Sequence, residues 1–136
     1  GMAGLRIGYM VASEDRVEKI MKLVRTEMGI SVTSLYAAMA STTDEEFLNK
    51  TMTLNGEARN YVYNSLKDLG YDPIKSHTSF ILYPINIPTK DFAEKMLEMG
   101  VGIRVFTIND KPYSRVSMGT MDEVKYFIES LDQITG

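Results

Sequence analysis

The sequence predicts an α/β fold, a two-layer sandwich in which helices cover one face of a small, largely antiparallel sheet. An orphan N-terminal strand and further helices are expected to precede this sandwich. Three observations support this class. From Thr43 onward the patterns run helix, strand, helix, strand, strand, helix. Of the 136 residues, 44% are hydrophobic and 24% charged, which suits one globular core. No internal repeat or low-complexity tract interrupts the pattern.

The first part of the chain contains a strand-like run followed by two helical patterns. Residues 5–11 are rich in strand formers, so we expect either an edge strand or a strand whose natural neighbours lie upstream. Should its natural neighbours lie upstream, the segment would be disordered, exchanged with another chain or docked in a dimer. Ser13 with the acids after it predicts a capped helix over about 14–27. A shorter helix is expected after Ser31.

The sandwich begins with the longest element, a helix expected from about Asp44 to Gly70. Thr43 and Glu46 have the spacing of a capping box, in which hydroxyl and carboxylate satisfy backbone N–H groups at the helix start. Thr120 and Glu123 repeat that spacing before the last helix. Between the long helix and the last helix we expect, in order, a strand over 78–83, a helix over 89–99, a strand over 103–106, a turn over 109–112 and a strand over 114–118.

Composition excludes several classes of function. The formal net charge is −3, from 15 basic and 18 acidic residues, so neither nucleic acid nor an anionic membrane is an expected partner. The chain has no cysteine, and His77 is its only histidine. Disulfide scaffolds, thiol catalysis and the usual zinc sites are therefore excluded. No apolar run has the length of a membrane span, and we expect a cytoplasmic protein.

Three arginines stand in strand-like surroundings. Arg6 lies within the apolar run 5–11, Arg115 lies inside the strand 114–118, and Arg104 opens another strand. An arginine in a strand either pairs with an anion or stays solvated on an exposed face, because an unpaired buried charge is very costly. The planar guanidinium suits bidentate binding of phosphate or carboxylate. Both alternatives remain open from the pattern alone.

Several blocks of sequence resemble one enzyme family. The chain is similar to the C-terminal part of pyridoxal-phosphate-dependent aminotransferases of the aspartate aminotransferase fold, and most similar to the histidinol-phosphate aminotransferase branch. The resemblance covers nearly the whole chain but only part of the family's fold. It is carried by residues 2–9 (MAGLRIGY), 44–47 (DEEF), 54–55 (LN), Arg59, Tyr61, Leu66, 76–82 (SHTSFIL), 100–104 (GVGIR) and 114–120 (SRVSMGT).

The resemblance implies roles for the three arginines and a division of the chain. Arg6 matches the arginine that binds the cofactor phosphate, and Arg115 matches the one that holds the substrate's anionic group. Arg104 matches a less constant position that assists a substrate phosphate. Residues 1–42 correspond to a remnant of the family's large cofactor domain, and residues 43–136 to its small C-terminal domain with a long leading helix.

The resemblance also implies what the chain lacks. The family's Schiff-base lysine precedes the segment that matches residues 2–9, so no catalytic residue is expected in this chain. We therefore expect that the chain alone binds no pyridoxal 5'-phosphate and has no aminotransferase activity. The intact parent would act on a small-molecule amino donor and a 2-oxo acid, as a homodimer. The alternative is a free-standing small α/β module that binds an anionic metabolite or mediates dimerisation.

Overall fold

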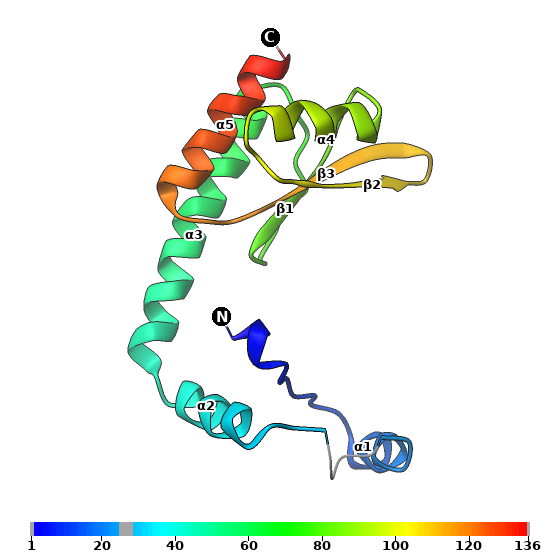
Figure 1. The fold of residues 1–136 in the computed structure, drawn as a ribbon, viewed down its shortest axis with the longest axis vertical. Coiled ribbons are helices and arrows are strands. Elements are labelled where there is room, and N and C mark those ends of the chain that lie inside the picture. The colour runs from blue at the N-terminus through cyan, green and yellow to red at the C-terminus, as the bar shows by residue number, and fades with distance from the viewer. Residues whose placement is uncertain (1, 25–28, 136) are drawn as a thin grey trace. The chain divides into compact units, whose positions relative to one another are not determined.

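The structure is a computed structural model that describes residues 2–24 and 29–135. It divides into two compact units, Gly1–Leu48 and Asn49–Gly136. The elements, labelled in Figure 1, are in chain order the 3₁₀ turn η1 (Ala3–Leu5), helices α1 (Glu14–Met21), α2 (Val32–Thr42) and α3 (Glu45–Asp68), strand β1 (Phe80–Pro84), helix α4 (Thr89–Glu98), strands β2 (Arg104–Ile108) and β3 (Lys111–Ser117), and helix α5 (Met121–Thr135).

The second unit confirms the predicted α/β class. Its three strands form one sheet in the order β1-β3-β2, and both strand pairs are antiparallel. Helices α3, α4 and α5 supply buried side chains to the same core as one face of this sheet. The buried apolar residues are Ala58, Val62, Leu66, Ile81, Tyr83, Ile85, Phe92, Met96, Val116, Val124, Phe127, Ile128 and Leu131.

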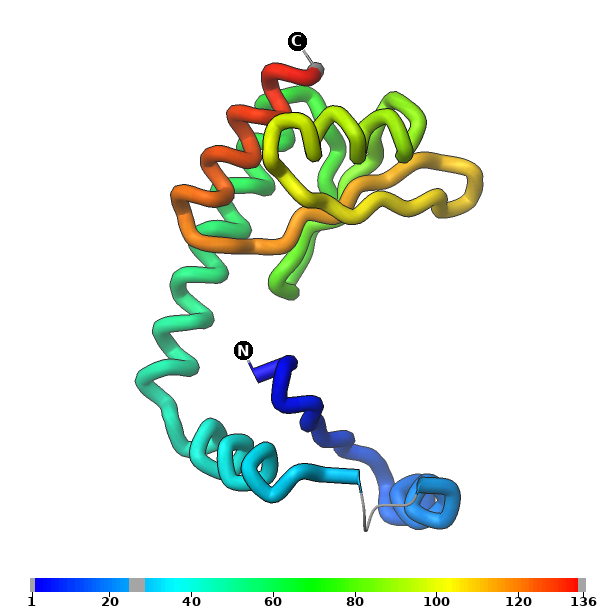
Figure 2. The backbone as a smooth tube through the Cα atoms, viewed as in Figure 1, coloured from blue at the N-terminus to red at the C-terminus, as the bar shows by residue number. Residues whose placement is uncertain are grey.

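Residues with positive φ form the turns that connect the elements around the sheet. Figure 2 follows the chain from α4 through the β2–β3 hairpin into α5. Asn109 and Asp110 both have positive φ, 49° and 60°, and form the two-residue hairpin turn, since these residue types tolerate that conformation. Gly100, with φ 77°, ends α4 and directs the chain towards β2. The turn and the order of the elements along the chain were predicted, whereas the order of the strands in the sheet and their register come from the structure.

The predicted capping box at the start of α5 is confirmed. The Glu123 N–H donates to Thr120 Oγ1 at 3.3 Å, and the Thr120 N–H donates to Glu123 Oε2 at 2.7 Å. At α3 the prediction was wrong by one residue, because Asp44 is the cap: its Oδ1 accepts the Phe47 N–H at 3.0 Å. The Thr43 hydroxyl instead donates to the Ala40 carbonyl at the end of α2.

The first unit departs from prediction at its start. Residues 5–11 form no strand, and Arg6 follows η1 with a left-handed backbone, φ 51°. The physical reason is that a strand needs a partner, and the described residues of this unit contain no sheet. Helix α1 ends at Met21, and residues 25–28 of the predicted helix lie outside the described residues. The helix expected after Ser31 is confirmed as α2.

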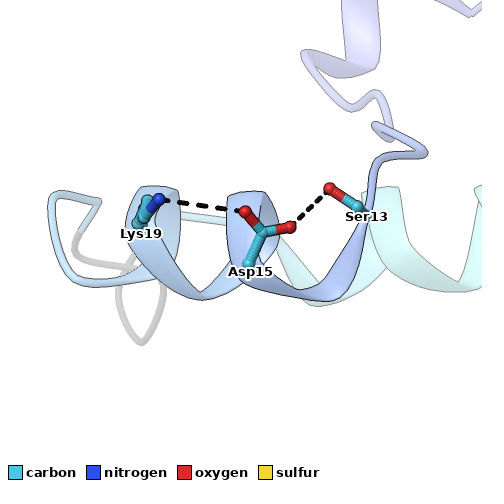
Figure 3. Close-up of polar contacts among 3 residues, drawn as sticks. All are labelled: Ser13, Asp15 and Lys19. Atoms are coloured by element: carbon cyan, nitrogen blue, oxygen red, sulfur yellow. Dashed lines mark hydrogen bonds and ion pairs between the residues drawn. The ribbon is translucent and has the colours of Figure 1, made fainter.

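The Ser13 cap was also wrong. The Ser13 hydroxyl donates to Asp15 Oδ1 at 2.6 Å, and it accepts no N–H from α1 (Figure 3). Asp15 then pairs with Lys19 one turn later, at 3.8 Å. None of the helices in the described ranges has the length and apolar character that crossing a bilayer requires.

Candidate functional site

The face of the sheet opposite the core carries two arginines side by side. Alternation along β3 buries Ser114 and Val116 in the core and turns Arg115 to the other face. The register pairs Arg115 directly with Arg104 on β2 and with Leu82 on β1. Directly paired residues of an antiparallel ladder project to the same side. The two arginines, eleven positions apart in sequence, are therefore neighbours on one surface.

This arrangement favours an anion. Like charges directly opposite each other destabilise a strand pair unless a counter-charge lies between them. Within the described ranges neither Arg104 nor Arg115 forms an ion pair. Arg104 is exposed, as the solvated alternative expects, whereas Arg115 is half-buried and its Nε is fully buried without a hydrogen-bond partner. The pair therefore offers two fixed positive charges to a negatively charged ligand.

Both arginines line an open depression of about 670 Å³ at one end of the sheet. Its walls are the loop from Gly100 to Ile103 and the start of α5. Glu123 is the one carboxylate in this lining, and it is occupied as the α5 cap. The N–H of Thr120 holds the pKa of Glu123 below its usual range, so this carboxylate stays ionised at neutral pH. An anion bound here would lie near Arg104, Arg115 and the Glu123 carboxylate, which already accepts the Thr120 N–H.

Two aromatic residues at this site were missed by the sequence analysis. The Cζ of Arg115 lies 4.8 Å from the ring centre of Phe80 and 6.0 Å from that of Phe106. The signal was present, since Phe106 lies two residues after Arg104 in the same strand and must share its face. Without the register of the three strands, no sequence pattern places either ring beside Arg115.

Arg6 belongs to the first unit and is exposed. Its Nη1 donates to the Ala3 carbonyl at 3.0 Å, which ties the side chain to the η1 turn. A guanidinium has five N–H donors, so four remain available for a phosphate group. Arg6 therefore has donors free to bind an anion. The described ranges hold no group of three or more histidine, cysteine or acidic residues that could bind a metal ion.

A family model, curated proteins and solved structures that match this chain all include aminotransferases. The family model for aminotransferase class I and II matches residues 1–131. A histidinol-phosphate aminotransferase of Caldicellulosiruptor saccharolyticus is 31% identical over 135 residues, which cover 98% of this chain and 37% of that protein. A crystal structure from Erwinia carotovora atroseptica, provisionally named as a histidinol-phosphate aminotransferase, has a TM-score of 0.88 at 28% identity and covers 98% of this chain.

A more distant structure shares the fold. The histidinol-phosphate aminotransferase of Sinorhizobium meliloti, solved in complex with pyridoxal-5'-phosphate, has a TM-score of 0.82 at 22% identity over 99% of this chain. This chain spans 38% of each of the two solved chains, and a similar share of the curated relatives it matches. All of these proteins are more than twice as long as this chain.

Proposed function

The chain belongs to the aminotransferase class I and II family, and we propose that it is the C-terminal part of a pyridoxal-phosphate-dependent enzyme of the histidinol-phosphate aminotransferase type. The observation that carries the proposal is the direct pairing of Arg104 with Arg115 on the core-free face of the sheet. In this proposal residues 1–42 are the remnant of a large cofactor domain, and residues 43–136 are the small domain.

In the proposed site Arg115 and Arg104 bind and orient the anionic group of the substrate. Two guanidinium groups match a doubly charged phosphate better than a single carboxylate, because each donates charge-assisted hydrogen bonds to a different edge of the anion. Their strand positions hold them without a loop movement. The chain's contribution to the reaction is thus to fix where the substrate lies relative to the reacting atoms.

Arg6 is proposed to hold the phosphate of the cofactor. Pyridoxal phosphate supplies an electron sink when it is bound. We propose that the lysine which anchors it, and which moves protons in the reaction, comes from a large domain outside this sequence. The 136-residue chain alone would then be inactive, and the complete protein would use an amino donor and a 2-oxo acid in the cytoplasm.

A chimera tests this proposal. Residues 2–136 replace the matching portion of the Caldicellulosiruptor saccharolyticus enzyme, and amino transfer from histidinol phosphate to 2-oxoglutarate is measured. We expect activity, and we expect Arg115→Gln to lower kcat/KM by about 10- to 100-fold, because removing a hydrogen bond to a charged group costs roughly 1.5–3 kcal/mol. Arg16→Gln, on the exposed surface of α1, is the matched control. A soluble chimera without activity would contradict the proposal.

A second function is supported by the second unit itself. Residues 49–136 have a core of their own and carry both arginines, so the unit meets the requirements of a free-standing anion-binding module. The exposed apolar side chains of the first unit, such as Tyr9 at 92% and Leu23 at 86%, would then serve dimerisation. The chimera separates the two functions: phosphate binding by the 136-residue chain together with a soluble but inactive chimera favours the module.

A further inference from the structure

The guanidinium of Arg115 lies between two aromatic rings. Its Cζ is 4.8 Å from the centre of the Phe80 ring and 6.0 Å from that of Phe106, and both distances fall within the range of a cation–π contact. Phe80 is on β1 and Phe106 is on β2, so the rings approach from the two strands that flank β3.

The register explains why these two residues reach Arg115. Phe80 pairs with Ser117, two residues after Arg115, and Phe106 pairs with Tyr113, two residues before it. Both rings are therefore diagonal neighbours of Arg115, a separation that aromatic and long side chains can span. They lie on opposite sides and in opposite directions along β3, which restrains the guanidinium on both flanks.

The burial of the individual nitrogens shows which donors remain open. Nε of Arg115 is buried and has no hydrogen-bond partner in the described part of the chain. The side chain as a whole is only half-buried and lines the open depression, so its two Nη groups are the donors left for a ligand. A ligand therefore reaches the guanidinium end-on, through the two Nη groups. Arg104 lies directly opposite Arg115. Without the restraint from the two rings, charge repulsion from Arg104 would move the Arg115 guanidinium away from an anion that both arginines could bind.

We propose that Phe80 and Phe106 are positioning residues that fix the Arg115 guanidinium for end-on binding of the substrate anion. This inference rests on the proposed function of Arg115. The rings act through Arg115 and do not touch the anion themselves. Their value is pre-organisation: a guanidinium that is already ordered loses less conformational freedom on binding.

The experiment uses the full 136-residue chain with inorganic phosphate as the probe. Phosphate affinity is measured by NMR titration, and the order of Arg115 by the solvent exchange of its Nε–H signal without phosphate. Phe80→Leu and Phe106→Leu keep an apolar side chain but remove the ring, and each should weaken phosphate binding by about two- to fivefold. Each should also accelerate exchange of the Arg115 Nε–H. Phe80→Tyr keeps the aromatic ring, so its phosphate affinity and its Arg115 Nε–H exchange should match those of the unaltered chain.

Controls separate this inference from the function it rests on. Phe47→Leu, at an exposed position on α3, should change neither readout. If Arg115→Gln abolishes phosphate binding while both leucine variants bind and exchange as the unaltered chain does, the positioning role is wrong and the anion role stands. If phosphate does not bind at all, the anion role in this chain fails, and the Nε–H exchange still decides whether the rings order Arg115. Phe106 is 39% exposed, so its variant remains informative should Phe80→Leu unfold.

Discussion

The two units differ in where their apolar side chains lie. In residues 49–136, thirteen apolar side chains are buried together. Among the described residues up to position 48, the only buried residue is Ser34, whose hydroxyl donates to the Leu5 carbonyl at 2.8 Å. Both units nevertheless contain amphipathic helices. Helical pattern and a core are therefore separate properties, and only the second unit has both.

The difference indicates how each unit is stabilised. Helix α1 has an apolar side, yet Ile20 is 39% exposed and Met21 is 51% exposed. Short isolated helices are marginal in water and gain most of their stability from packing of that side. An exposed apolar surface of this kind is typical of a contact with another part of a protein. Under the proposed function, the contact is the large domain.

The largest expected effect is the loss of a core side chain in the second unit. Phe92 is 1% exposed, and Phe92→Ala should lower the free energy of unfolding by about 3–5 kcal/mol in urea titration, because it leaves a cavity. Leu97→Ala, at a 67% exposed position of the same helix, is the control and should change it by less than about 0.5 kcal/mol. Leu35→Ala, in the first unit, should match the control. A loss at Leu35 as large as that at Phe92 would mean that Leu35 is buried in solution and that the first unit has a core.

The next effect depends on pH. Burial raises the pKa of Tyr83 well above its usual value, so the folded chain keeps this proton after the unfolded chain has lost it. The stabilisation is complete below about pH 10, the usual tyrosine pKa, and is then lost by up to about 1.4 kcal/mol per pH unit. Tyr83→Phe should flatten this alkaline loss in urea titrations at successive pH values. Tyr9→Phe, at a 92% exposed position, should leave it unchanged. An equal slope in both variants would contradict the assignment to Tyr83.

A smaller effect compares the caps of the two units. Thr120→Ala removes the hydroxyl that accepts the Glu123 N–H, and it should destabilise the second unit by about 1 kcal/mol. Ser13→Ala removes a hydroxyl that binds only the Asp15 carboxylate in Figure 3, so urea titration should show no change beyond error. Helicity by circular dichroism should follow the same order. A clear loss in Ser13→Ala would show that Ser13 caps α1 in solution.

The sequence predicted the elements that depend on local chemistry. The Thr120–Glu123 box and the turn at Asn109–Asp110 were both identified, because each acts within a few residues. The strand expected over residues 5–11 was wrong, since a strand depends on a distant partner that the pattern does not contain. Ser13 was wrong for a different reason: Asp15 competes for its hydroxyl at a spacing that also suits a cap.

The candidate site was predicted residue by residue but not as an arrangement. Arg104 and Arg115 were singled out separately, because strand patterns show that each has an unusual setting. Their direct pairing depends on the register of the β2–β3 hairpin, which the two-residue turn determines. Phe80 could be connected with Arg115 only once the β1–β3 register was known. The role of Arg6 remains a prediction from the resemblance, with an exposed guanidinium that is compatible with it.

The smallest expected effect concerns two matched ion pairs, one in each unit. Asp15 and Lys19 on α1 approach to 3.8 Å, as do Lys90 and Glu94 on α4, and all four side chains are more than 60% exposed. Lys90→Gln should cost less than about 0.5 kcal/mol in urea titration, because exposed pairs are screened by water and salt. Lys19→Gln should lower helicity more, since an acid one turn before a lysine is the better order for a helix and α1 has no core to hold it. Addition of 1 M salt should remove both differences. A salt-independent loss at Lys19 would mean that its side chain acts through packing, and the first unit would then hold more structure than its exposed surface indicates.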